Sequence, residues 1–291
     1  MTLLTTITRI LALSTGESIF YRESGSPSAP TIVLLHGFPS SSHQYRNLIP
    51  LLAPTYRVIA PDFPGFGFTN VSSSYTYTFD NIAATISTFL SEIHDPPAKY
   101  AIYIFDYGAP VGLRLALQQP ERVSAIIAQN GNAYAEGLGA FWDPIRTLWS
   151  TNNSADARAA LLPFLQTGTK GQYIDGEPDP SALDPASWTL DQALLERPGV
   201  FDIQLDLLYD YRTNLELYPK VQDWFRESQV PLVTAWGKND IIFPPVGADA
   251  YKKDLPGAEI NLLDAGHFAV ESHTGAIAGI ILDFLSRKRI V

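Results

Sequence analysis

Hydrophobic residues along this chain fall into short runs that are separated by polar turns and by longer amphipathic stretches. Several runs are continuous and rich in β-branched residues, which is typical of parallel strands that are buried on both faces. The amphipathic stretches repeat their apolar positions every three or four residues, which indicates helices. We predict strands at residues 7–12, 18–23, 31–35, 57–60, 100–105, 124–128, 231–236 and 259–263, and helices at 80–93, 109–118 and 274–285.

The alternation of strands and helices predicts an α/β fold, with a mostly parallel, eight-stranded sheet and helices on both of its faces. The alternation stops between residues 133 and 225, where prolines, aromatic residues and helix-like patterns leave no convincing strand. We interpret residues 1–132 and 226–291 as the core domain and residues 133–225 as an inserted helical cap. Such a cap would lie over the carboxyl ends of the strands, where α/β sheets bind their ligands.

The composition excludes several classes of protein. With 46% hydrophobic and 17% charged residues, the 291-residue chain can bury a large core. A net charge of −10 argues against a nucleic-acid partner, and no apolar run is long enough to span a membrane. The absence of cysteine fits a reducing compartment, and the first residues lack the pattern of a signal peptide, so we expect a cytoplasmic protein. The cap region carries fourteen acidic and six basic residues, which would mildly disfavour anionic substrates.

The strand predicted at residues 100–105 ends in Asp106, and Gly108 follows just before a predicted helix. This strand–turn–helix arrangement is typical of a nucleophile elbow, a tight turn that lifts one side chain above the end of a sheet. Serine is the usual occupant of that position. A carboxylate there suits attack on a saturated carbon that bears a leaving group, because the product is an ester that water can hydrolyse. Attack on an ester carbonyl would instead give a reactive anhydride.

Residues at the ends of three other predicted strands could assist this carboxylate. His267 follows a glycine in an exposed loop and suits a general base, and Asp240 could orient its ring. The Phe38 backbone N–H, together with that of Tyr107, could form an oxyanion hole. We expect His36 to hold the loop that contains Phe38 rather than to take part in the chemistry.

Five motifs lie at residues 36–39 (HGFP), 61–67 (PDFPGFG), 106–108 (DYG), 236–240 (WGKND) and 265–268 (AGHF). Together they resemble those of α/β-hydrolase-fold enzymes of the epoxide hydrolase and haloalkane dehalogenase group, and the likeness covers nearly the whole chain. It implies a cofactor-independent reaction in which Asp106 forms an alkyl-enzyme ester. His267, oriented by Asp240, would then activate the water that hydrolyses this ester. Ile104 departs from the family pattern, which has a small residue two positions before the nucleophile.

The resemblance leaves the leaving group open. Epoxide hydrolases stabilise the opening ring oxygen with cap tyrosines, whereas haloalkane dehalogenases hold a halide with Trp or Asn N–H groups. Tyr211, in the cap segment 208–214, matches a ring-opening tyrosine of the epoxide hydrolases. A second tyrosine is not evident, since Trp149 stands where it is expected, and Tyr134 could substitute for it. Tyr107 replaces a tryptophan that both groups commonly carry, which removes one halide donor.

We therefore expect an epoxide hydrolase that converts a small neutral hydrophobic substrate to a vicinal diol. A haloalkane dehalogenase is the second hypothesis, and a hydrolase of another neutral substrate, such as a lactone, is the third. Haloacid dehalogenases also resemble the chain, but they place arginines beside the nucleophile. After Asp106, this chain has no arginine until Arg114. A binding protein that keeps the fold without turnover is the non-enzyme alternative, and a homodimer is compatible with each hypothesis.

Overall fold

The computed structural model describes residues 4–290 and has a seven-stranded central sheet with the strand order β1-β2-β4-β3-β5-β6-β7. The antiparallel pairs are β1·β2 and β2·β4, and the strands from β4 across to β7 pair in parallel. This sheet confirms the predicted α/β fold. The strands are β1 (Ile7–Ala12), β2 (Ser18–Ser24), β3 (Thr31–Leu35), β4 (Arg57–Pro61), β5 (Tyr100–Phe105), β6 (Val123–Gln129) and β7 (Leu232–Thr234).

The predicted eighth strand is formed only in part, because β8 (Trp236–Gly237) and β9 (Leu262–Leu263) make a separate two-stranded sheet. The interruption lies at Thr234 and Asn261. The backbone N–H of Asn261 donates to the Thr234 hydroxyl at 3.0 Å, and the Asn261 side-chain amide donates to the Thr234 carbonyl at 3.1 Å. Side-chain hydrogen bonds thus replace one step of the ladder between the two chain segments. The prediction of eight strands is therefore corrected to seven strands and a short flanking pair.

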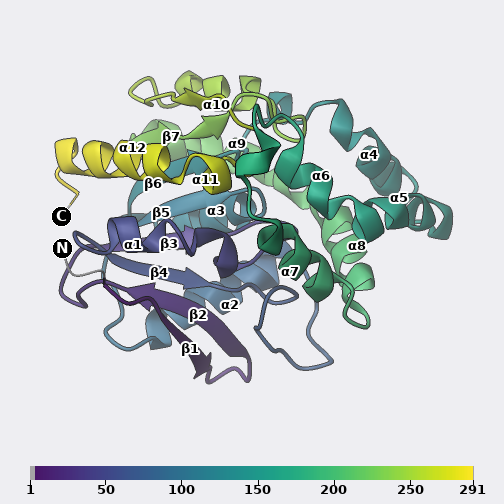
Figure 1. The fold of residues 1–291 in the computed structure, drawn as a ribbon, viewed down its shortest axis with the longest axis horizontal. Helices are drawn as coiled ribbons and strands as arrows, with labels where there is room; N and C mark the ends of the chain where they lie inside the picture. The colour runs from purple at the N-terminus through teal and green to yellow at the C-terminus, as the bar shows by residue number, and fades with distance from the viewer. Residues whose placement is uncertain (1–3, 291) are drawn as a thin grey trace.

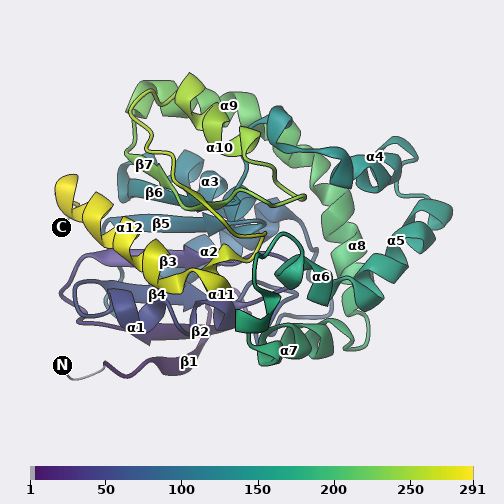
Figure 2. The same ribbon diagram turned by 45° about the horizontal axis from the view of Figure 1, so that its top comes forward.

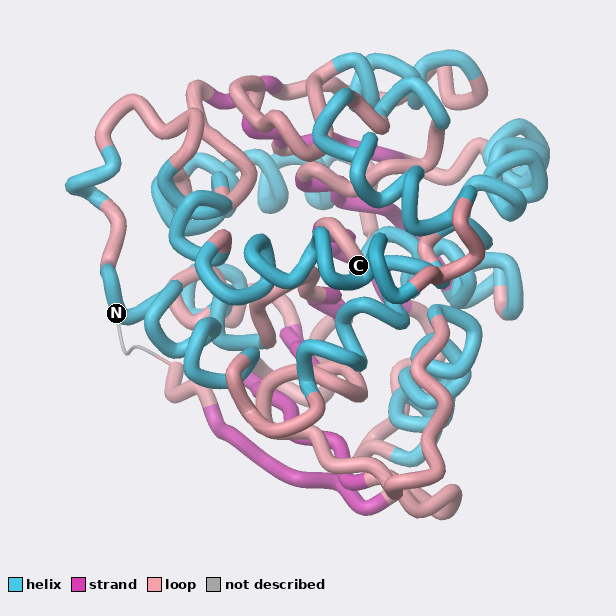
Figure 3. The backbone as a smooth tube through the Cα atoms, turned by 90° about the vertical axis from the view of Figure 1, so that its right-hand side faces the viewer, coloured by secondary structure: helices cyan, strands magenta, loops and turns pink. Residues whose placement is uncertain are grey.

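Helices cover both faces of the sheet, which explains the continuous apolar runs of its strands. On β3, Ile32 and Leu34 belong to one core, and Val33 and Leu35 belong to the other. The first core is closed by α1 (Ile49–Leu52) and α12 (Thr274–Arg287), and the second by α2 (Phe79–Glu92), α3 (Gly108–Gln118) and α9 (Arg212–Ser228). Figure 3 shows the strands in magenta with helices in cyan around them.

The described chain between β6 and β7 contains helices and loops but no strand, as expected for an inserted helical cap. In Figures 1 and 2 the cap helices α4 to α8 lie on the side of the molecule opposite the two termini. The boundaries at residues 133 and 225 stay a prediction, since α9 continues to Ser228 and packs against α3 of the core. The first five cap helices are α4 (Asp143–Ser150), α5 (Ala155–Thr167), α6 (Thr169–Ile174), α7 (Pro185–Leu195) and α8 (Val200–Asp210). Within residues 4–290, no helix has the length and apolar character that crossing a membrane requires.

Candidate functional site

Asp106 occupies a tight turn between β5 and α3. Its backbone φ is +47°, in the left-handed region that residues other than glycine seldom adopt. Glycines on both sides allow this turn to pack closely, because a Cβ atom on Gly108 would lie 2.1 Å from the Leu35 carbonyl oxygen. A Cβ atom on Gly37 would likewise lie 2.3 Å from the Cβ of Asp106. The turn therefore has the strained geometry of a nucleophile elbow.

The departure from the family pattern at Ile104 is compensated in helix α3. A Cβ atom on Gly112 would lie 2.6 Å from Cγ2 of Ile104, so this part of the helix accepts only glycine without a shift. Gly112 on the helix thus provides the space for Ile104, which a small residue on the strand would not need. The elbow keeps close contact between β5 and α3 despite the larger strand residue.

The two carboxylate oxygens of Asp106 have different neighbours. Oδ1 accepts a hydrogen bond from the Phe38 backbone N–H at 2.6 Å. Oδ2 lies 3.9 Å from Nε2 of His267, which is beyond hydrogen-bond length. Burial raises the pKa of Asp106 to about 6, although the His267 charge and the backbone N–H groups of Phe38 and Tyr107 lower it in part. One oxygen is therefore held by the loop after β3, and the other is free to react.

His267 and Asp240 form a buried pair next to this free oxygen. Nδ1 of His267 lies 2.7 Å from Oδ2 of Asp240, while Nε2 has no hydrogen-bond partner among the described residues. The other oxygen of Asp240 accepts from the Ile242 backbone N–H at 2.7 Å. Burial lowers the pKa of His267, but the charges of Asp240 and Asp106 outweigh it and raise the pKa above its ordinary value. The structure thus brings the three residues predicted from the sequence into one site.

Asn130, which the sequence analysis did not select, supports Asp240 from the end of β6. Its side-chain amide donates to Oδ2 of Asp240 at 2.8 Å. Its carbonyl oxygen accepts from the Gly237 backbone N–H at 2.9 Å, so the residue ties the Asp240 loop to the sheet. The signal that could have found it is a polar residue directly after a buried strand, the same signal that marks Asp106.

His36 holds the loop that contains Phe38. Its Nε2 accepts a hydrogen bond from the Phe63 backbone N–H at 2.9 Å, and its ring stacks on that of Phe63. Burial lowers the pKa of His36 to about 3, so the ring is neutral at physiological pH. The ring of Tyr107 is buried between Phe38 and Phe79, with centroids 5.9 and 5.0 Å away. These aromatic contacts leave the backbone N–H groups of Phe38 and Tyr107 directed at Asp106.

Tyr211 is the predicted cap residue that the structure brings close to Asp106. It is fully buried, its ring centroid lies 6.0 Å from that of Tyr107, and its hydroxyl lies beside the hydroxyl of Tyr218. Burial raises the pKa of Tyr211 well above its ordinary value, and the Asp106 charge adds to this shift. The hydroxyl is therefore protonated and able to donate a hydrogen bond.

The other two predicted cap residues use their polar atoms elsewhere. The indole N–H of Trp149 donates to the Leu208 carbonyl at 2.8 Å, although its ring stacks parallel to that of Tyr211. The hydroxyl of Tyr134 donates to Oδ2 of Asp254 at 2.8 Å. We therefore correct the expectation that either residue is poised to stabilise a leaving group.

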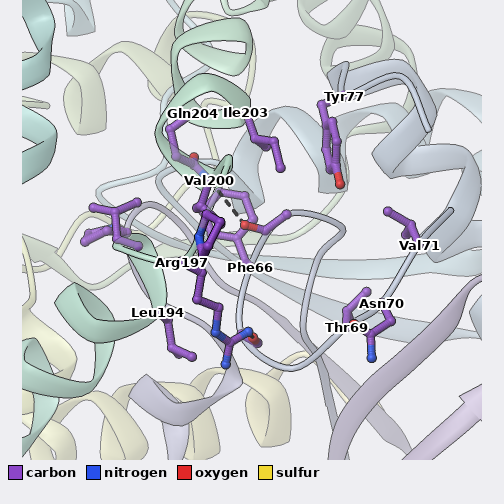
Figure 4. A pocket seen from close by; sticks show the side chains of 15 residues that line it. Phe66, Thr69, Asn70, Val71, Tyr77, Leu194, Arg197, Val200, Ile203 and Gln204 are labelled. Carbon is purple, nitrogen blue, oxygen red and sulfur yellow. Dashed lines mark hydrogen bonds between the residues drawn. The ribbon is translucent and has the colours of Figure 1, made fainter. Parts of the chain in front are cut away.

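Two of the cavities between the cap and the core border the loops of the site. One, of about 180 Å³, reaches His267 and Asp240, and its walls include Phe141, Phe164 and Ile241. The second, of about 200 Å³, lies between the loop after β4 and helices α7 and α8 (Figure 4). Its lining includes none of the three site residues. The first cavity is therefore the one that could admit a substrate to the site, and its walls favour an apolar one.

Comparisons with known proteins agree with this architecture. Residues 30–274 match the family model of the alpha/beta hydrolase fold. The chain is 46% identical over 277 residues to an uncharacterized hydrolase of Saccharomyces cerevisiae, with 94% of this chain and 95% of that protein covered. It is 35% identical over 280 residues to a haloalkane dehalogenase of Psychrobacter cryohalolentis, with 92% and 87% covered. The structure of the epoxide hydrolase CorEH shares the fold, with a TM-score of 0.77, 18% identity, and 97% and 99% of the two chains covered.

Proposed function

Because this chain belongs to the α/β-hydrolase fold family, in its epoxide hydrolase and haloalkane dehalogenase group, we propose that this hydrolase opens epoxides through an alkyl-enzyme ester. The observation that carries the proposal is the arrangement around Asp106. One of its oxygens is held by the Phe38 N–H, the other faces an unpartnered His267 nitrogen, and the protonated hydroxyl of Tyr211 is buried nearby, beside that of Tyr218. These are the groups that ring opening and ester hydrolysis require.

In the first step, Oδ2 of Asp106 attacks one carbon of the epoxide and forms the ester bond. The bond between that carbon and the ring oxygen breaks, and the oxygen takes the proton of the Tyr211 hydroxyl. The Phe38 N–H supports this step, because it keeps Oδ1 in place and leaves Oδ2 directed toward the substrate.

In the second step, Nε2 of His267 takes a proton from water, and the resulting hydroxide attacks the ester carbonyl carbon. The backbone N–H groups of Phe38 and Tyr107 stabilise the oxyanion, and Asp240 stabilises the charged imidazole. Collapse of the intermediate restores Asp106 and releases the diol. The two protons of the water end on the departing alkoxide and on the Tyr211 oxygen, so the net reaction adds one water to one epoxide.

Hydrogen bonding in the cap favours an epoxide over a halide. The indole N–H groups of Trp142 and Trp149 both donate to backbone carbonyls, at 2.9 and 2.8 Å, and residue 107 is a tyrosine. The Tyr211 hydroxyl, in contrast, is bound to no backbone carbonyl of the described residues, and it lies beside the hydroxyl of Tyr218. A haloalkane dehalogenase is the second candidate, supported by the relative that is 35% identical. It would require one of these indoles to release its carbonyl and bind the halide.

The test is to trap the ester in a His267→Gln variant, in which the second step is blocked. The variant is offered styrene oxide and 1-bromobutane in separate reactions, and the intact protein is weighed and then digested. We expect styrene oxide to add its whole mass at Asp106, and an Asp106→Asn, His267→Gln double variant to add nothing. An adduct from the bromoalkane alone would favour the dehalogenase, and an adduct at another residue would refute Asp106 as the nucleophile.

A further inference from the structure

A short cap segment lies against both loops that carry the predicted base and its orienting acid. We call this segment the strap, and it consists of Asp175, Gly176 and Glu177, which follow α6. Oε1 of Glu177 accepts a hydrogen bond from the Gly266 backbone N–H at 2.9 Å. The side-chain amide of Asn239 donates to the Gly176 carbonyl at 2.8 Å. The strap therefore binds the residue before His267 and the residue before Asp240.

The strap and the two loops fit together at the level of the backbone. A Cβ atom on Gly266 would lie 2.2 Å from the Asp175 carbonyl oxygen. Gly176 has a φ of +82°, and a Cβ atom there would lie 2.6 Å from the Asn239 carbonyl oxygen. Neither contact leaves space for a side chain, so the strap and the two loops pack directly backbone against backbone.

Helix α6 extends this contact to the other side of His267. The ring of Tyr173 stacks on that of Phe268, with a centroid distance of 3.8 Å and an angle of 10° between the planes. The cap thus holds both sequence neighbours of His267, one by a hydrogen bond and the other by an aromatic stack. The place of the imidazole in the site depends on the place of the cap.

Glu177 is an unusual residue for a purely structural contact. Its side chain is buried, with 8% of the residue exposed, and the ion pairs found among residues 4–290 do not include it. Its carboxylate accepts from the Gly266 N–H, which an apolar side chain in the same place could not do.

We propose that Glu177 is a positioning residue, through which docking of the cap places His267 for the attack of water on the ester. This inference rests on the proposed function, because His267 acts in the second step of that mechanism. The first step uses Asp106, Phe38 and Tyr211, which take no part in the two hydrogen bonds that hold the strap. Loss of the bond between Glu177 and Gly266 therefore slows ester hydrolysis and leaves ester formation unchanged, whereas a general loss of stability would slow both steps.

The experiment follows both steps separately in a Glu177→Ala variant with styrene oxide. We expect the single-turnover rate of ester formation to match the wild type, kcat to fall about tenfold, and the covalent adduct to accumulate during turnover. Glu177→Gln keeps an oxygen that can accept from Gly266, so it is expected to restore hydrolysis and remove the adduct. Arg197→Ala is the matched control, because it removes a cap-to-core hydrogen bond to the Gly67 carbonyl at the other cavity (Figure 4). It is expected to show no adduct.

The His267→Gln variant separates the two proposals. If it traps no adduct, the proposed function itself is refuted. If it traps an adduct and Glu177→Ala slows both steps equally, or slows neither, the positioning role is overturned. If Glu177→Ala fails to fold, Asn239→Ala takes its place, because it removes the hydrogen bond from the core to the strap. This variant is expected to accumulate the same covalent adduct, and normal hydrolysis in it would equally overturn the inference.

Discussion

At the scale of single residues, the pKa of Asp106 sets the acidic limit of the first chemical step. Asp106 attacks only as a carboxylate, and burial raises its pKa to about 6. We expect the rate of ester formation to be level above that pH and to fall about tenfold for each pH unit below it. The His267 charge lowers the pKa of Asp106, so His267→Gln should move this inflection to higher pH. Quenched-flow measurements from pH 4.5 to 8 give both profiles, and a flat wild-type profile would contradict the assignment.

The same burial makes the nucleophile a source of instability. In the unfolded chain the Asp106 carboxyl has its ordinary pKa of 3.8, against about 6 in the folded protein. The folded state therefore binds the proton more tightly, and the wild type loses stability as the pH rises from about 4 to about 6. We expect Asp106→Asn to be more stable than the wild type by about 1–3 kcal/mol at pH 7. Urea unfolding at pH 7 and pH 3.5 tests this, since the difference should nearly vanish at the lower pH.

Tyr211 separates the two candidate leaving groups. Tyr211→Phe removes the acid that ring opening needs, so the rate of ester formation from styrene oxide should fall by about 10²-fold or more. Ester formation from a bromoalkane needs no such proton and should be unaffected. The variant should fold normally, because only the contact with the Tyr218 hydroxyl is lost, and Tyr218 keeps its hydrogen bond from the Asn132 side chain at 3.2 Å. Equal losses with both substrates would indicate that Tyr211 shapes the pocket instead of donating a proton.

Residues at strand ends could be predicted from the sequence, whereas cap residues could not. Asp106, Asp240 and His267 each follow an apolar run, and the carboxyl ends of parallel strands meet at one edge of a sheet. Trp149 and Tyr134 do not directly follow strands, so no sheet edge fixes where their side chains lie. The acceptors of their polar hydrogens, Leu208 and Asp254, lie 59 and 120 residues further along the chain. Only the packing of the cap reveals that these donors are already occupied.

At the scale of elements, β5 and α3 fit together through Ile104 and Gly112. Gly112→Ala should destabilise the protein by about 1–3 kcal/mol, because the new methyl group would meet Cγ2 of Ile104 at 2.6 Å. This loss outweighs the helix propensity that alanine gains over glycine, about 1 kcal/mol. Adding Ile104→Ala removes the clash, so the two changes should cost less together than the sum of their separate costs. Urea unfolding of the four proteins gives the coupling energy, and strict additivity would contradict this fit.

The interrupted eighth strand shows that a hydrophobic pattern can predict a strand but not a break in its pairing. Residues 231–236 and 259–263 have the composition of paired strands, and they do run side by side. Thr234 and Asn261 then compete with the ladder through their side chains. Such competition depends on which two residues meet across the pair, and a pattern read along a single strand cannot show that.

At the scale of the whole molecule, the reacting groups are buried. Asp106 is 4% exposed and His267 is 2% exposed, whereas Ile241, in the wall of the cavity beside His267, is 60% exposed. In Figure 1 the cap helices α4 to α8 lie along one side of the molecule. Burial of the reacting groups strengthens the electrostatic interactions that the proposed mechanism uses, because it excludes bulk water. The cavity beside His267 is the route by which a substrate could reach them, and most of its lining residues come from the cap. Asp175 of the strap is one of these residues, so the strap lies both on this route and against the loop that carries His267.

The uneven charge of the molecule gives a prediction that does not depend on any single residue. Residues 133–225 carry fourteen acidic and six basic side chains of a chain with a net charge of −10, so the field over the entrance repels anions. Glycidamide and the glycidate anion are matched epoxides that differ in charge. Between about 0.01 M and about 1 M salt the screening length falls from about 30 Å to about 3 Å. We expect kcat/KM for glycidate to rise several-fold over this range while that for glycidamide stays level. If neither value changes, the field over the entrance does not select against anions, and this prediction is wrong.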